Sequence, residues 1–192
     1  MAAKVKAYVE LTVLHIFNSD PGHRRESLHS VPKWTPPPAG TVLINIDAAL
    51  FASSRRMGVG VVVRNHIGEC LAACSERLDG ITTPELAEAL AFRRSTALAR
   101  DEGYQNVIIA SDCLSVVQRL NLSRRDRSTV GAVISDIKSM AEGFSSVVFR
   151  HVSRVVNVAA HTLARSCDHF VSSFIRNGVP DFIRKTLYND VL

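Results

Sequence analysis

Three carboxylates occupy positions where acidic residues are uncommon. Asp47 lies inside a run of aliphatic residues that predicts a strand, and Asp112 directly follows a second such run. Glu88 lies one turn into a predicted helix, between two alanines that leave room for a close approach to a sheet. Because ligand sites form at strand ends in α/β proteins, these side chains can converge to hold divalent cations such as Mg²⁺. Taken singly, each has a plainer interpretation, since a surface glutamate is usually solvated and a strand-end aspartate usually caps a helix.

Arginines near the predicted site are candidates for contact with phosphates. They lie in the turn after the first predicted strand, in the loop after the second predicted helix and near the last helix, at Arg55, Arg56, Arg124, Arg125, Arg127 and Arg154. The net charge of +5 favours an anionic partner, and basic clusters neutralise nucleic-acid phosphates, although many are only solvated loops. Aromatic residues are 6% of the chain, so we expect contacts to the nucleic-acid backbone without sequence specificity.

The elements that must position these residues alternate between strands and helices. Strands are predicted from residue 41 onward and at 59–64, 69–75, 107–110 and 146–152, and helices at 84–103, 114–120, 130–140 and 156–170. A proline-rich segment at 36–38 marks a domain boundary. We therefore expect an appendage over residues 1–33, one α/β domain over 34–172 and a loosely attached tail over 173–192.

Composition excludes several other classes of protein. Of the 192 residues, 46% are hydrophobic and 21% charged, as in ordinary globular domains and unlike disordered or coiled-coil chains. No apolar run approaches the 18 residues of a membrane span. The four cysteines are too few and too irregularly spaced for a disulfide scaffold, and no clear signal-peptide cleavage site follows the N-terminus. We expect free thiols and an intracellular protein, in the nucleus or cytoplasm, that is neither secreted nor bound in a membrane.

Five short motifs, in order, carry a resemblance to a known family. They lie at residues 45–49, 58–68, 87–91, 110–112 and 152–164, and they contain Asp47, Glu88, Asp112, Asn157 and His161. In order and spacing the chain resembles a ribonuclease H-like domain over residues 34–172. More specifically, it is similar to the plant type associated with reverse transcriptases of non-LTR retrotransposons.

The resemblance implies an α/β fold with a five-stranded mixed sheet, in the order 3-2-1-4-5 with strand 2 antiparallel, flanked by helices. It also implies a monomer that binds RNA/DNA hybrids or other nucleic acid, and four carboxylates that hold two Mg²⁺ ions to hydrolyse the RNA strand. Asp47, Glu88 and Asp112 match three of these metal-binding catalytic residues. Arg154 and Asn157 lie where contact with nucleic acid is expected.

The fourth carboxylate position holds His161, which departs from the family pattern. Imidazole is a poor ligand for Mg²⁺ and a better one for Mn²⁺, so we expect His161 to be a substitute ligand in an enzyme of reduced activity. Two alternatives stay open: a domesticated retroelement domain that binds nucleic acid without cleaving it, and a folded remnant with no ligand.

Overall fold

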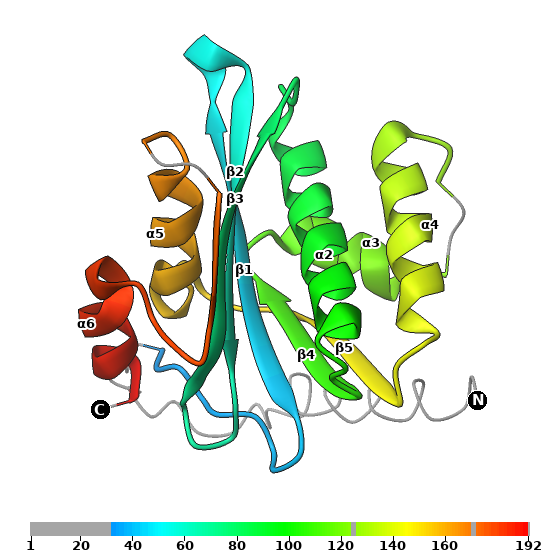
Figure 1. Ribbon diagram of the computed structural model, residues 1–192. Coiled ribbons are helices and arrows are strands. Elements are labelled where there is room, and N and C mark those ends of the chain that lie inside the picture. The colour runs from blue at the N-terminus through cyan, green and yellow to red at the C-terminus, as the bar shows by residue number, and fades with distance from the viewer. Residues whose placement is uncertain (1–31, 124–125, 170–171, 192) are drawn as a thin grey trace, which may run out of the picture. The chain divides into compact units, whose positions relative to one another are not determined.

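A mixed six-stranded sheet organises the part of the chain that the computed structural model describes, residues 32–123, 126–169 and 172–191 (Figure 1). The strands are β1 (Val42–Phe51), β2 (Arg56–Arg64), β3 (Cys70–Asp79), β4 (Asn106–Ser111), β5 (Ser146–His151) and β6 (Ser173–Arg176). Their spatial order is β5-β4-β1-β2-β3-β6. β4 is parallel to β1 and β5 to β4, whereas β2 is antiparallel to both of its neighbours. The predicted order and the antiparallel second strand are confirmed, with one strand more than expected.

Helices cover both faces of the sheet (Figure 1). One face carries α2 (Pro84–Asp101), α3 (Leu114–Asn121) and α4 (Thr129–Ala141), and the other carries α5 (Val158–Ser166) and α6 (Asp181–Val191). The start of α2 follows from its sequence, because Thr83 is the N-cap and proline at the first helical position loses no hydrogen bond. Just beyond its last residues, Gly103 has φ of +75°, a left-handed conformation that glycine adopts without strain.

Burial on both faces explains the nearly continuous apolar sequence of β1. Ile44 and Ile46 pack in the core that also contains Phe92 of α2, whereas Leu43 packs on the opposite face with Trp34. Asp47 follows Ile46 in the same strand and is 4% exposed. A buried carboxylate in a central strand costs free energy unless it has polar partners, which directs attention to its surroundings.

Two glycines in β2 allow α5 to lie directly against the sheet. A Cβ atom at Gly60 would stand 2.0 Å from the Ala160 carbonyl oxygen, and one at Gly58 would stand 2.0 Å from that of Ala164. Both distances are far inside van der Waals contact, so no larger residue fits without moving the helix. This close approach sets the height of α5 above the sheet.

The C-terminal residues differ from the expected loose tail. β6 pairs antiparallel with β3, and α6 buries Ile183 completely, in a cluster with Val62 and Leu163. Arg176 of β6 also donates to both carboxylate oxygens of Glu102, at 2.7–3.1 Å. Residues 173–191 therefore complete one edge of the sheet and one helical layer. The expectation of a loose tail is wrong because the sequence does not reveal that Ile183 and Leu187 pack back onto the domain.

The last predicted helix, 156–170, is also divided differently. A short 3-10 helix, η2 (Arg154–Val156), precedes α5, which begins only at Val158. Asn157 lies between the two with φ of −112°, outside helical geometry. This break turns the Asn157 side chain toward the sheet. A second 3-10 helix, η1 (Ala52–Ser54), follows β1.

All four cysteines are free thiols. Among the helices of the described residues, none is long and apolar enough to cross a membrane.

Candidate active site

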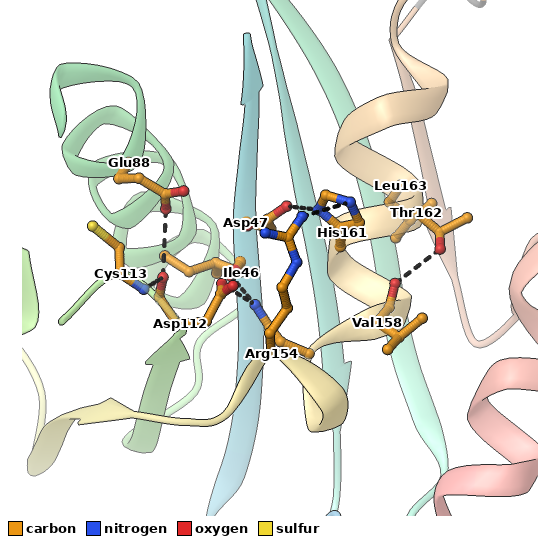
Figure 2. Close-up of polar contacts among 12 residues, drawn as sticks. Ile46, Asp47, Glu88, Asp112, Cys113, Arg154, Val158, His161, Thr162 and Leu163 are labelled. Carbon is orange, nitrogen blue, oxygen red and sulfur yellow. Dashed lines mark hydrogen bonds and ion pairs between the residues drawn. The ribbon is translucent and has the colours of Figure 1, made fainter. Parts of the chain in front are cut away.

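Asp47 in the middle of β1 is the centre of the candidate site. Its Oδ2 atom lies 2.6 Å from Nδ1 of His161 on α5, and Figure 2 shows the two side chains pointing toward each other. The pKa of Asp47 is raised to about 6, because burial and the negative charge of Asp112 outweigh the hydrogen bond from His161, which acts in the opposite direction. The carboxyl group is therefore held in a place that favours a nearby positive charge.

Glu88 on α2 is the second carboxylate. Burial raises its pKa from 4.5 to about 8, and the negative charges of Asp47 and Asp112 add to that rise. The Ser111 hydroxyl donates to its Oε2 atom at 3.4 Å. This bond places Glu88 next to the end of β4, directly before Asp112, although Glu88 itself comes from α2.

Asp112 is held by Asn157, the residue between η2 and α5. The Asn157 side-chain amide donates to Oδ1 of Asp112 at 3.0 Å and to the main-chain oxygen of Ile46 at 2.8 Å. Because β1 and β4 are adjacent and parallel, this amide bridges the two strands at the point where the carboxylates lie. Asp112 was also considered as a helix cap, but the N-cap of α3 is Cys113.

A buried polar chain supports Asn157 from behind. Asn45 donates to Oδ1 of Asn157 at 3.2 Å and accepts from Arg64 at 2.9 Å and from Trp34 at 3.3 Å. The Arg64 guanidinium, which is 1% exposed, lies 3.9 Å from the centre of the Trp34 ring, a cation–π contact. Arg64 was not among the predicted site residues, although it supports Asn157 through Asn45. The available signal was a charged residue at the end of an otherwise apolar strand.

His161 makes contacts through both nitrogens of its ring. Nδ1 faces Asp47, and Nε2 lies 3.2 Å from a guanidinium nitrogen of Arg154. The Arg154 side chain reaches up from η2 to the ring (Figure 2). His161 is thus placed beside the carboxylates, as its position in the sequence pattern predicted, but both of its nitrogens already have partners.

The three carboxylates have the donor chemistry of a site for a hard divalent cation, since Mg²⁺ prefers carboxylate oxygens. The raised pKa values of Asp47 and Glu88 fit such a site, because buried negative charges that repel one another are relieved by a bound cation. Within the described ranges, no group of three or more His, Cys, Asp and Glu side chains has the geometry to hold a metal ion as it stands. Each carboxylate has a hydrogen-bond partner instead. Asp47 contacts His161, Asp112 contacts Asn157, and Glu88 contacts Ser111.

The predicted phosphate-binding arginines lie at separate places. Arg55, Arg127 and Arg154 are exposed, and Arg55 lies in the turn before β2 with φ of +52°. Arg56 forms a surface ion pair with Asp79 at 3.3 Å, an interaction of small net energy. Arg124 and Arg125 lie outside the described residues. Of the four that the structure describes, Arg154 is the one that contacts the residues around Asp47.

The fold and the arrangement of the site define a ribonuclease H-like domain. RNase H1 from the archaeon Halobacterium salinarum NRC-1 superposes with a TM-score of 0.61 at 22% identity, over 66% of this chain and 96% of that one. LC11-RNase H1 in complex with an RNA/DNA hybrid superposes with a TM-score of 0.58 at 21% identity, over 65% and 94%. LC9-RNase H1, described as a type 1 RNase H with the type 2 active-site motif, has a TM-score of 0.59 at 15% identity, over 82% and 88%. At these identities the likeness shows the fold.

Sequence comparison gives the family. Residues 45–167, more than half of the chain, match the reverse transcriptase-like family, and the chain belongs to that family. No curated protein sequence matches it significantly. The predicted ribonuclease H-like identity and the α/β fold class are confirmed.

Proposed function

We propose that this domain binds RNA/DNA hybrids and hydrolyses their RNA strand in a reaction that depends on a divalent cation. The observation that carries the proposal is the convergence of Asp47, Glu88 and Asp112, whose carboxyl groups repel one another in a partly buried site. Carboxyl groups whose pKa values are raised by burial and by one another are typical of functional sites. The family membership supports the same reading.

Each side chain then has a stated role. Asp47, Glu88 and Asp112 would hold the cation, and their all-oxygen donor set suits Mg²⁺ and also Mn²⁺. The bound cation supplies activation of water and neutralises the charge that develops on the phosphate. Asn157 orients Asp112, and His161 orients Asp47 through the hydrogen bond at 2.6 Å. Because a carboxylate is missing at position 161, we expect slower cleavage than four carboxylates would give.

The proposed substrate follows from the fold and from the surface. A solved structure of this fold holds an RNA/DNA hybrid, as does that of the foamy viral protease-reverse transcriptase, which matches at a TM-score of 0.55 and 14% identity over 80% of this chain and 24% of that one. Exposed arginines at positions 55, 127 and 154 can contact phosphates. Contacts of this kind read the backbone and not the bases, so we propose cleavage without sequence preference.

A cleavage assay tests the proposal. A hybrid with labelled RNA is incubated with the full chain, with Mg²⁺ or Mn²⁺ or with a chelator, and with matched RNA and DNA duplexes as controls. We expect cleavage of the RNA strand only in the hybrid and only with a cation. Asp47→Asn should abolish it, whereas Asp79→Asn, at the exposed end of β3, should not. Equal cleavage by Asp47→Asn would refute the assignment of the site.

A second candidate function is binding of nucleic acid without cleavage, and the contacts of His161 favour it. An imidazole bonded on both sides gives the site fewer acidic ligands than the family pattern has. The samples of the cleavage assay separate the two functions when they are also run in a gel mobility-shift assay. A binding module shifts the hybrid while the RNA strand stays intact. His161→Asp should then increase cleavage with Mg²⁺, since a carboxylate is a hard, anionic ligand.

We also propose, from the motifs alone, an origin in a plant non-LTR retrotransposon and action as a monomer in the nucleus or cytoplasm. The four free thiols are consistent with a reducing compartment.

A further inference from the structure

The hydrogen-bond directions at His161 follow from the chemistry of its two partners. A guanidinium group can only donate, so Arg154 donates to Nε2 of His161 at 3.2 Å, and Nε2 must carry its lone pair. The ring proton is then on Nδ1, which donates to Oδ2 of Asp47 at 2.6 Å. Donation therefore runs in one direction, from Arg154 through His161 to Asp47. Neither ring nitrogen offers a free lone pair to a metal ion, so the expectation that His161 is a substitute ligand does not fit these contacts.

The charges around Asp47 are unusual for a site of several cations. Three carboxylates supply a charge of −3 when ionised, and the Arg154 guanidinium places a charge of +1 beside them, against the far nitrogen of the His161 ring. A charge of −2 remains, which one divalent cation neutralises. A second divalent cation would have to lie beside the carboxylate that the Arg154–His161 pair already contacts, and it would be repelled by the guanidinium.

We propose that the Arg154–His161 pair takes the place of a second divalent cation, so that this site binds one such ion, through Asp47, Glu88 and Asp112. The inference rests on the proposed function, because it presumes a cation site. It differs from the two-ion arrangement that the resemblance implies. His161 and Arg154 are then positioning residues, which act on the cation through Asp47.

The number of bound ions tests the inference without any measurement of activity. Mn²⁺ is titrated into the full chain, and free Mn²⁺ is followed by electron paramagnetic resonance. We expect one bound Mn²⁺ for the wild type and two for His161→Asp. The matched control is His66→Asp, which adds the same charge in the exposed β2–β3 turn and should still bind one.

A second variant avoids any change inside the fold. Arg154 is exposed, so Arg154→Glu should leave the structure intact while it removes the donor to Nε2 and reverses the charge. We expect Mn²⁺ binding to become tighter by on the order of tenfold. Arg100→Glu, at the other end of α2 and twelve residues from Glu88, or about 18 Å along the helix, should leave the affinity unchanged.

The outcomes separate this inference from the proposed function. Two Mn²⁺ ions in the wild type, or one in a folded His161→Asp protein, would overturn the inference and leave cation-dependent cleavage standing. Absence of Mn²⁺ binding in every variant would overturn both. If His161→Asp does not fold, Arg154→Glu decides, and unchanged affinity there overturns the inference. Nitrogen-15 NMR of the metal-free protein must also show His161 protonated on Nδ1, and protonation on Nε2 alone would contradict it.

Discussion

At the scale of single residues, Asp47 and Glu88 are both buried acids, but their surroundings differ. Asp47 has a hydrogen bond from His161 that partly offsets the effect of burial on its pKa. For Glu88, hydrogen bonds from the Ser111 hydroxyl and from the main chain of Ala48 lower the pKa, while the negative charges of Asp47 and Asp112 raise it. The pKa of Glu88 is therefore the higher of the two, at about 8 against about 6.

The raised pKa of Glu88 predicts how stability depends on pH. The native state binds the Glu88 proton more tightly than the unfolded state, so its stabilising effect is complete below about pH 4.5 and is lost as the pH rises through about 8. Without a cation, the free energy of unfolding should therefore fall between pH 5 and pH 9. For Glu88→Gln we expect a fall smaller by on the order of 2–4 kcal/mol, measured by urea unfolding at each pH. Added Mg²⁺ should flatten the wild-type curve, and parallel curves for the two proteins would contradict the prediction.

At the scale of elements, the contact between β2 and α5 controls where two site residues lie. α5 carries His161 and begins next to Asn157, and its backbone rests on Gly58 and Gly60. A side chain at either glycine would lift the helix away from the sheet. Since the bond between His161 and Asp47 is 2.6 Å long, a shift of less than 1 Å is enough to break it.

Gly60→Ala is therefore expected to damage stability and the site together. Its Cβ would meet the Ala160 carbonyl oxygen at 2.0 Å, so we expect a loss of about 3 kcal/mol or more in the free energy of unfolding. Gly143→Ala is the control, because its Cβ would meet its nearest neighbour at an ordinary 3.4 Å. Thermal or urea unfolding of the two variants measures the difference. A Gly60→Ala protein as stable as Gly143→Ala would show that α5 is not held this closely.

The loops that carry exposed arginines give a prediction about salt. Each phosphate contact that is lost should reduce the slope of log K against log salt by about 0.9 for a B-form duplex, and by a comparable amount for a hybrid. We expect Arg55→Glu and Arg127→Glu each to lower this slope for hybrid binding, whereas Arg184→Glu on α6 should not. Fluorescence anisotropy between low and moderate salt measures it. Slopes unchanged from wild type would remove these two loops from the nucleic-acid surface.

At the scale of the whole molecule, the C-terminal residues form a second hydrophobic cluster on the α5 face. Ile183 is completely buried there, whereas Tyr188 on the same helix is 67% exposed. Ile183→Ala should therefore cost about 2–4 kcal/mol in unfolding free energy, and Tyr188→Ala less than about 0.5 kcal/mol. Chemical denaturation of both variants provides the comparison. If Ile183→Ala proves as harmless as Tyr188→Ala, α6 contributes little to the fold.

Sequence patterns predicted the central strands and the long helices because these have clear signals. β1 and β4 are apolar runs, and α2 has a proline at its start and a glycine after its end. β6 has only four residues, too few to show a strand period, and the sequence does not reveal that α6 packs against α5 and β2. For the site, residue types and spacing indicated Asp47, Glu88 and Asp112. The direction of the bonds at His161 could not be predicted, because it depends on an arginine seven positions away whose side chain must reach the ring.

The buried chain from Trp34 to Asp112 affects how a fragment of this protein should be chosen. The family match begins at residue 45, but Trp34, eleven residues earlier, covers the Arg64 guanidinium whose partner Asn45 holds Asn157. A fragment trimmed to the matched residues would expose that arginine to water and remove the aromatic ring from a polar chain that ends at a carboxylate of the site. Such a fragment would keep Asp47, Glu88 and Asp112 and still be a poor substitute for the intact domain. The segment from residue 32 onward therefore belongs in any minimal version.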